Sequence, residues 1–354
     1  MQLPRTELNN GSPGPRLQAW LGVDEGHLKM SKHWKWLGRG VLVALALVAG
    51  ILTVGFMYQR MGLLADREVL TPPDQLTQLT THRVYVDCSG EGPTVIFING
   101  LGVVAQSWDR IRREVGSRYR TCIYDRAGNG YSETAMLPRD VEASVRELEE
   151  LLEATGTRTP VILVAHSYGG LIARVFAHKN PGKVAGIVSV DSSHEDMGER
   201  FPPEIQTQFK QQLQAFGLVS LLNRFGIGRL VGIHDQFATG LEGEAYERAR
   251  AHYLTTAHML AAAAEAKSWP VSAHIARRIE EIPVPMTVIA VDKWPAEMVP
   301  SWIAMQQELA SRSVRGKYIL AAGADHFGIL QSKEYAPLVT REILALAEEF
   351  WPVR

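Results

Sequence analysis

Short apolar runs and longer helical patterns alternate along most of this chain. The short runs are continuous and rich in β-branched residues, which is the pattern of strands buried on both faces of a sheet. Helical patterns, with apolar positions three and four residues apart, separate several of them, for example at residues 108–120 and 141–152. This alternation predicts an α/β domain with a mainly parallel sheet. The strands predicted in this alternation are residues 94–98, 121–124, 161–165, 184–190, 286–291 and 317–321.

One further strand is predicted ahead of these, where residues 82–87 alternate between polar and apolar side chains. The segment 89–93 that follows, Ser-Gly-Glu-Gly-Pro, is rich in turn-forming residues and leads into the strand at 94–98. This spacing predicts that the two strands form a hairpin.

The alternation stops between residues 195 and 281, where the pattern is mainly helical. Helices are predicted at residues 203–217, 218–231 and 245–267. The run 216–231 is apolar on most sides and carries only two charges. Such a segment could line a hydrophobic pocket or contact a bilayer; we favour simple packing onto the domain beneath it.

A longer apolar segment lies near the amino terminus. Residues 41–58 carry no charge over 18 positions and would extend about 27 Å as a helix, enough to cross the hydrocarbon core of a membrane. We predict a single-pass transmembrane helix; a cleaved signal sequence and a buried helix of a soluble domain are the alternatives. The lack of a clear small-x-small cleavage site with a polar flank favours the anchor.

Charges on either side of this segment predict its orientation. Basic residues between positions 29 and 39 precede it, whereas basic and acidic side chains follow it together. The positive-inside rule then places the amino terminus in the cytoplasm and the bulk of the chain outside. Residues 1–40, rich in Gly, Pro, Asn and basic side chains, are predicted to be a disordered cytoplasmic tail. Residues 59–80 are predicted to be a stalk with a turn at 71–74.

The length and composition indicate how many domains the chain can form and which kinds of partner it can bind. With 354 residues, of which 46% are hydrophobic, the chain is long enough for one catalytic domain with an appended region. Its formal net charge of -1 gives no general attraction to nucleic acid, so no nucleic-acid partner is expected. No metal motif such as His-Glu-x-x-His and no phosphate-binding glycine motif occurs, so the sequence predicts no metal and no cofactor.

The strongest chemical signal lies at Ser167, where the strand at 161–165 changes into a helical pattern. A sharp strand-to-helix turn strains the backbone of its central residue and lifts that side chain above the sheet, which suits a nucleophile. The local sequence, Ala165-His-Ser-Tyr-Gly169, resembles the Gly-x-Ser-x-Gly nucleophile elbow of the α/β-hydrolase family, with alanine at the first glycine. An incidental serine in a turn of small residues is the alternative.

Further segments resemble the same family in the same order along the chain. They are Asn99-Gly-Leu-Gly102 after a strand, the turn Tyr124-Asp-Arg-Ala-Gly-Asn-Gly-Tyr-Ser132, and His326 in the loop after the last strand. The resemblance spans residues 80–352 and implies an α/β-hydrolase fold for residues 81–354. Such a fold has a mostly parallel eight-stranded sheet with helices on both faces, and its helical lid would lie at about residues 195–281.

The resemblance also implies the other parts of a catalytic site. His326 is expected to be the general base, and its acid partner is either Asp191, which ends one strand, or Asp292, which ends the next. We favour Asp191, a position that some members use, and keep Asp292 as the alternative. The backbone amides of Leu101 and Tyr168 are the expected oxyanion hole, although the family's usual His-Gly before the first amide is Asn-Gly here.

The same resemblance bears on the two cysteines. Cys88 would end the second strand of the fold, and Cys122 would begin the antiparallel strand beside it. A bridge would close a loop of 34 residues and would agree with an oxidising compartment outside the cytoplasm. Two separate reduced thiols in the core are the alternative.

A serine nucleophile excludes the aspartyl-ester mechanism of epoxide hydrolases and dehalogenases, and leaves acyl transfer to water through an acyl-enzyme. The resemblance therefore implies a membrane-anchored serine esterase that acts outside the cytoplasm. Its substrate would be a small-molecule ester or a lipid-like ester with an apolar acyl group. A noncatalytic binding protein of the same fold, or a related lyase or perhydrolase, is the alternative.

Overall fold

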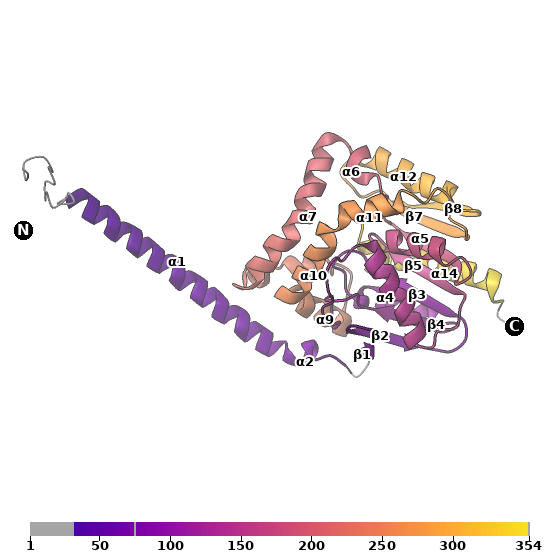
Figure 1. Ribbon diagram of the computed structural model, residues 1–354, viewed down its shortest axis with the longest axis horizontal. Helices are drawn as coiled ribbons and strands as arrows, with labels where there is room; N and C mark the ends of the chain where they lie inside the picture. The colour runs from indigo at the N-terminus through magenta and orange to yellow at the C-terminus, as the bar shows by residue number, and fades with distance from the viewer. Residues whose placement is uncertain (1–31, 74–75, 353–354) are drawn as a thin grey trace, which may run out of the picture. The chain divides into compact units, whose positions relative to one another are not determined.

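The computed structural model describes residues 32–73 and 76–352 (Figure 1). Contacts between Cα atoms divide the chain into two compact units, Met1–Ile51 and Leu52–Arg354. The disordered tail predicted at residues 1–40 lies mostly outside the described residues, and its described part, residues 32–40, is helical. The last residue of the turn predicted in the stalk also lies outside the described residues. The described part of the first unit is entirely helical.

The predicted transmembrane segment, residues 41–58, is part of one continuous helix, α1 (Lys32–Ala65). Many of the apolar side chains along it are exposed, for example Leu47 at 64% and Ile51 at 71%. Between Trp36 and Ala65 this helix is long and apolar enough to cross a membrane. The helix is therefore present as expected, and its insertion into a bilayer stays a prediction.

Residues 59–80, predicted to be a stalk, contain regular structure. Helix α1 continues into them, the short helix α2 (Arg67–Leu70) follows, and β1 (Leu76–Gln78) pairs antiparallel with β2 (Arg83–Ser89). The sheet thus begins inside this segment, because β1 pairs with backbone groups of β2 that would otherwise form an open edge.

The described residues contain one eight-stranded sheet with the order β1-β2-β4-β3-β5-β6-β7-β8 (Figure 1). The pairs β1 with β2 and β2 with β4 are antiparallel, and every other neighbouring pair is parallel. This confirms the predicted mostly parallel sheet. The strands after β2 are β3 (Thr94–Ile98), β4 (Arg120–Tyr124), β5 (Val161–His166), β6 (Val184–Val190), β7 (Met286–Val291) and β8 (Gly316–Ala321).

The hairpin predicted from residues 82–87 and 94–98 is wrong, because β4 lies between β2 and β3. Strand β3 pairs parallel with both β4 and β5. All of its residues are buried, whereas β2 exposes Arg83 and Ser89 at its ends. A strand that is apolar on both faces is most stable inside the sheet, beneath helices on either side, and this outweighs the short turn that favours pairing with β2.

Alternate residues of the central strands face two separate hydrophobic cores. On β3, Ile96 and Ile98 belong to one core, while Val95 and Phe97 belong to the other. Helices therefore cover both faces of the sheet, as predicted. Helices α4 (Val141–Ala154), α5 (Gly169–Lys179) and α12 (Val299–Ser311) contribute to the first core, and α3 (Asp109–Val115) and α14 (Ala336–Phe350) to the second.

The helical region between β6 and β7 differs from its prediction at two boundaries. Helix α7 (Pro203–Asn223) runs through Gly217 without a break, because it packs along α10 (Thr256–Lys267). The single helix predicted at 245–267 is two helices, since the Thr255 hydroxyl accepts a hydrogen bond from His258 N (3.2 Å) and caps a new helix. The other helices here are α6 (Met197–Arg200), α8 (Ile227–Leu230), η2 (Ile233–Gln236), α9 (Gly243–Tyr253) and α11 (Trp269–Ala276).

The two cysteines form a disulfide between β2 and β4. Cys88 and Cys122 lie directly opposite each other in this antiparallel pair, with Cα atoms 4.1 Å apart. The prediction of a bridge is confirmed, and the alternative of two separate thiols is wrong. Closing a loop of this length stabilises the fold by about 3 to 4 kcal/mol on the loop-entropy model.

Candidate active site

Ser167 lies at the turn between β5 and α5, with a backbone φ of 52°. Positive φ is costly for a residue with a side chain, so the surroundings must hold the turn in place. They do so by close packing: a Cβ on Gly169 would lie 2.6 Å from Ile98 O, and one on Gly100 would lie 3.0 Å from Ser167 Cβ. A side chain at position 169 would collide with this backbone oxygen, and one at position 100 would press on its neighbours, so both positions favour glycine. The strained turn at Ser167 is therefore present.

His326 lies in the loop between β8 and α13 (Gly328–Gln331) and is held at two points. Its Nδ1 lies 2.6 Å from Asp191 Oδ2, so the imidazole N–H donates to the carboxylate. Its backbone carbonyl accepts a hydrogen bond from His166 Nε2 (2.8 Å). Because His166 immediately precedes Ser167, this bond ties the loop of the expected base to the elbow of the expected nucleophile.

His166 can make this bond only with a proton on Nε2, since a carbonyl cannot donate. Burial, together with the charge of His326, lowers the pKa of His166 well below its ordinary value. The imidazole therefore stays neutral, and its ring packs 4.4 Å from that of His326 between ring centroids. His166 therefore packs within the elbow and also makes a hydrogen bond that positions the loop of His326.

Of the two candidate acids, the structure brings Asp191 to His326. Asp191 follows β6 with a φ of 42° and is fully buried. Its second oxygen, Oδ1, accepts hydrogen bonds from Trp302 Nε1 (2.9 Å) and Val291 N (3.1 Å). Both oxygens of this carboxylate are thus oriented by donors, which fixes the plane of the carboxylate against the imidazole.

Asp292 is engaged elsewhere. Its Oδ1 accepts a hydrogen bond from Gly323 N (2.6 Å), at the end of β8. In this arrangement Asp292 joins two neighbouring loops, while the hydrogen bond to His326 is made by Asp191. Asp292, the alternative acid from the sequence, therefore links two loops in this structure and makes its hydrogen bond to Gly323.

The loop that carries Leu101 is fixed through its carbonyl groups. Arg126 donates from Nη1 to Asn99 O (2.7 Å) and from Nη2 to Gly100 O (2.8 Å). The N–H of Leu101 belongs to the same trans peptide as Gly100 O and points the opposite way. Holding that carbonyl therefore also sets the direction of the Leu101 amide, one of the two donors expected for an oxyanion hole.

The second expected donor, Tyr168 N–H, lies at the amino-terminal end of α5, where Tyr168 is the cap residue. Amides at this end of a helix point away from the helix and carry a partial positive charge. Leu101, Tyr168, Ser167 and His326 all line one pocket. The expected nucleophile, base and amide donors thus come from different loops and meet in the same cavity.

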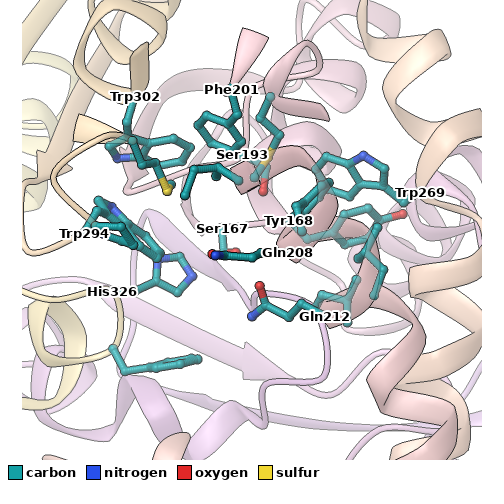
Figure 2. A pocket seen from close by; sticks show the side chains of 18 of the residues that line it. Ser167, Tyr168, Ser193, Phe201, Gln208, Gln212, Trp269, Trp294, Trp302 and His326 are labelled. Carbon is teal, nitrogen blue, oxygen red and sulfur yellow. The ribbon is translucent and has the colours of Figure 1, made fainter. Parts of the chain in front are cut away.

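This pocket has a volume of about 260 Å³ and is lined mainly by apolar side chains. In Figure 2, Ser167 lies near the centre, with His326, Trp294 and Trp302 on one side and Tyr168 and Trp269 on the other. Polar side chains on the lid helix α7, Gln208 and Gln212, also point inward (Figure 2). The remaining lining residues are Val103, Ser193, Met197, Phe201, Ile205, Phe209, Leu213, Phe216, Phe237, Pro295, Met298 and Phe327.

Sequence reasoning missed several residues of this site. Trp302 lies in a helix with no motif, and its bond to Asp191 spans 111 positions. Arg126 belongs to the turn at residues 124–132, which entered the sequence analysis only as a segment that resembles the family. The pocket face of α7 repeats at helical spacing, at Ile205, Gln208 and Gln212, and this period could have indicated a wall of the pocket.

Among residues 32–73 and 76–352, no group of three or more His, Cys, Asp or Glu side chains is arranged to hold a metal ion. The chemistry available in the pocket is that of the hydroxyl, imidazole, carboxylate and amide groups described above. Such a set suits nucleophilic attack on a carbonyl carbon with general-base assistance.

Comparison with known proteins identifies the class to which the fold and this pocket belong. A model of the Alpha/beta hydrolase family matches residues 95–338, which is more than half of the chain. The chain belongs to this family. An esterase from Thermogutta terrifontis has a solved structure that is similar with a TM-score of 0.60 at 20% identity, covering 77% of this chain and 98% of the esterase. At that identity the likeness concerns the fold alone.

Sequence relatives match over shorter stretches. YqjL, an uncharacterised protein of Bacillus subtilis, is 33% identical over 114 residues, which are 32% of this chain and 45% of YqjL. YbdG, another uncharacterised protein of that organism, is 27% identical over 166 residues, or 46% of this chain and 51% of YbdG. The chain thus spans about half the length of these relatives.

Proposed function

We propose that this chain is a serine hydrolase that cleaves carboxylic esters through an acyl-enzyme. Ser167 is the nucleophile, His326 the general base and Asp191 the residue that orients it. The observation that carries the proposal is the 2.6 Å hydrogen bond from His326 to a fully buried Asp191, beside a serine held at positive φ. His326 is bonded to Asp191 and lines the same pocket as Ser167, which supports the set of groups that acyl transfer requires.

In the proposed reaction, Ser167 Oγ attacks the ester carbonyl carbon while His326 Nε2 takes the hydroxyl proton. The negative charge that develops on the carbonyl oxygen is stabilised by the N–H groups of Leu101 and Tyr168. Collapse of this intermediate breaks the bond to the alcohol, which leaves with the proton from His326. A water molecule then attacks the acyl-enzyme with the same histidine as base, releasing the carboxylic acid and restoring the serine.

The pocket supports an apolar acyl group as the substrate of this reaction. Side chains such as Phe209, Leu213 and Phe216 face it from α7, and Trp269 and Met197 come from the neighbouring lid helices. Desolvation of an alkyl chain in such a pocket favours binding by about 0.8 kcal/mol for each buried methylene group. The substrate is therefore a small-molecule ester or a lipid-like ester rather than a polar metabolite.

The location of the reaction follows from two features. The apolar helix α1 supports a single-pass anchor, and the excess of basic residues before it supports an amino terminus in the cytoplasm. The disulfide between Cys88 and Cys122 supports an oxidising environment for the domain, since bridges persist mainly outside the cytoplasm. We infer that the active site acts on the extracytoplasmic side of a membrane.

A fluorophosphonate probe, which reacts with activated serines, tests the proposal on the purified full-length chain. We expect stoichiometric labelling of the wild type and none of Ser167→Ala, with ester turnover lowered about 10⁴-fold or more in the variant. A matched control is Ser193→Ala, which removes another hydroxyl that lines the same pocket and should keep the label.

Absence of labelling in folded wild-type protein would contradict the proposal and favour a noncatalytic binding protein of the same fold. Labelling without release of acid and alcohol from any ester would instead favour a related lyase or perhydrolase. A panel of p-nitrophenyl esters of increasing acyl length, assayed without added peroxide, separates these outcomes.

A further inference from the structure

The end of helix α1 is joined to the lid by buried polar contacts. Gln59, only 3% exposed, donates a hydrogen bond from Nε2 to Leu254 O (2.8 Å) at the end of α9. Asp66, 5% exposed, accepts hydrogen bonds from Arg229 (2.7 Å) and Arg250 (2.6 Å), one from α8 and one from α9. Buried polar groups with partners of this kind fix a geometry, because breaking one pair leaves a desolvated charge unpaired.

Close backbone packing joins the same two regions further up the helix. A Cβ on Gly55 would lie 2.5 Å from Phe225 O, and one on Gly226 would lie 2.6 Å from the ring of Tyr58. Gly55 and Tyr58 belong to the segment 41–58 that is proposed to span the membrane. The loop between α7 and α8 therefore packs against the last turn of that segment.

The surface of the lid around this loop is apolar and open. Leu218, Leu221, Ile227, Leu230 and Val231 are 56%, 50%, 37%, 76% and 66% exposed. Clustered exposed side chains of this size are uncommon on a surface that faces only water. We call residues 218–231 the lid tip.

Charges at the lid tip suit a membrane surface. Of its two charged residues, Arg229 is paired with the buried Asp66, and Arg224 is exposed. A segment with apolar side chains and an exposed cation is typical of helices that lie in the interfacial region of a bilayer, where the cation meets lipid phosphate.

We propose that the lid tip is a membrane-contact surface, with Leu218, Leu221, Leu230 and Val231 inserted into the interfacial region of the bilayer that α1 spans. The inference rests on the proposed membrane anchor and adds a second contact with the same bilayer. Its partner is phospholipid, because the lid tip is packed against helix residues that are themselves proposed to lie in lipid.

This contact connects the bilayer to the pocket through one helix. Phe209, Gln212 and Phe216 of α7 line the pocket, and Leu218 and Leu221 follow on the same helix within two turns. A lid helix that begins in the pocket wall and ends in lipid would deliver apolar acyl substrates from the membrane rather than from water. The proposed contact therefore points to an ester dissolved in the bilayer as the class of substrate.

Spin labelling of the full-length chain in vesicles of phosphatidylcholine and phosphatidylglycerol tests the proposal without requiring activity. Both native cysteines are in the disulfide, so a cysteine introduced in Leu221→Cys or Leu230→Cys is the single free thiol. Val314→Cys, at a residue 56% exposed just before β8, is the control. We expect the lid-tip labels to be relaxed by oxygen and shielded from a water-soluble nickel complex, and the control to show the reverse.

Access of the nickel complex to the lid tip equal to that of the control would overturn the proposal. Spin–spin broadening at the lid tip that disappears on dilution with unlabelled protein would also overturn it, because a second copy would then cover the surface. Neither outcome depends on whether the chain hydrolyses esters, so this experiment and the fluorophosphonate experiment fail independently.

Hydrolysis by variants that carry a charge at the lid tip tests whether the membrane contact matters for function. We expect Leu221→Asp/Leu230→Asp to lower hydrolysis of a long-chain ester presented in vesicles by about tenfold or more, because two leucines leave the bilayer. Hydrolysis of water-soluble p-nitrophenyl acetate should be unchanged, and Val314→Asp should change neither rate. Unchanged hydrolysis in vesicles, or an equal loss on both substrates, would contradict a role in membrane contact.

Discussion

The two walls of the pocket are built by different means. On the wall formed by the sheet, short loops after the strands carry Ser167, Asp191 and His326. Hydrogen bonds hold the Asp191 and His326 side chains and the backbone of Ser167. On the wall formed by the lid, side chains of α7 such as Phe209 and Leu213 are half-buried and pack by contact of apolar surface.

If the proposed function holds, this difference assigns reactivity to the sheet wall and substrate selectivity to the lid wall. Hydrogen bonds are directional, so the sheet wall can hold reacting groups to within a fraction of an ångström, as general-base catalysis requires. Apolar packing is not directional, so the lid wall can change shape or residue without disturbing the groups beneath it. Substitutions in the sheet wall should therefore change turnover, and substitutions in the lid wall should change which ester is accepted.

The largest effect that tests this contrast is expected at the acid. Asp191→Asn removes the negative charge that orients and stabilises the imidazolium of His326, and kcat should fall by about 10³- to 10⁴-fold. Steady-state kinetics on a short p-nitrophenyl ester measures it. The matched variant Asp292→Asn should retain kcat within about threefold, since this carboxylate binds Gly323 N. A larger loss in Asp292→Asn than in Asp191→Asn would reverse the assignment.

A smaller effect is expected from the lid wall. The ring of Phe209 packs edge-on against Trp269, with ring centroids 5.2 Å apart, and Phe209→Ala would enlarge the pocket at this point. We expect the ratio of kcat/KM for a long-chain ester over a short-chain ester to rise about fivefold, the equivalent of one or two more buried methylene groups.

The rate of fluorophosphonate labelling distinguishes a change of selectivity from a change of reactivity in this variant. It should stay within about twofold of the wild type in Phe209→Ala, because the sheet wall is unaffected. Phe350→Ala, at a residue 39% exposed on α14, is the control for loss of a phenyl ring elsewhere. A large fall in labelling would mean that the lid wall also positions the nucleophile.

An effect on stability rather than on catalysis concerns pH and the lid. His252 on α9 is buried against Tyr131, and burial, with the charges of His258 and Arg248, lowers its pKa to about 3 from an ordinary value of 6.5. Above pH 6.5 both folded and unfolded chains hold this group neutral. As the pH falls below 6.5, the unfolded chain binds a proton there that the folded chain does not, so stability is lost progressively down to about pH 3.

His252→Phe keeps a ring at this position and removes the titration. Between pH 7 and pH 5 the free energy of unfolding of the wild type should fall by about 2 kcal/mol more than that of the variant. Denaturant unfolding of the full chain in detergent at both pH values measures this difference. Parallel pH dependence in the two proteins would show that His252 titrates normally and that this part of the lid is open to water.

The sequence by itself determined the elements that depend on neighbouring residues. Strands β3 to β8 were predicted from short apolar runs. Most of them, such as β3, β5, β6 and β7, are buried on both faces, which requires apolar side chains at consecutive positions. Ser167 was predicted at a strained elbow because small residues and a change of period occur within a few positions. The same local order supported the family and the pairing of Cys88 with Cys122.

Only the tertiary structure decided which distant residues meet. The position of β4 between β2 and β3, and the hydrogen bonds that Asp191 makes with Trp302 and His326, join parts of the chain that local patterns do not connect. The buried contacts of Asp66 with Arg229 and Arg250 are of the same kind. Such partners are selected by packing of the whole domain, because a buried charge or donor is stable only where folding happens to bring its complement.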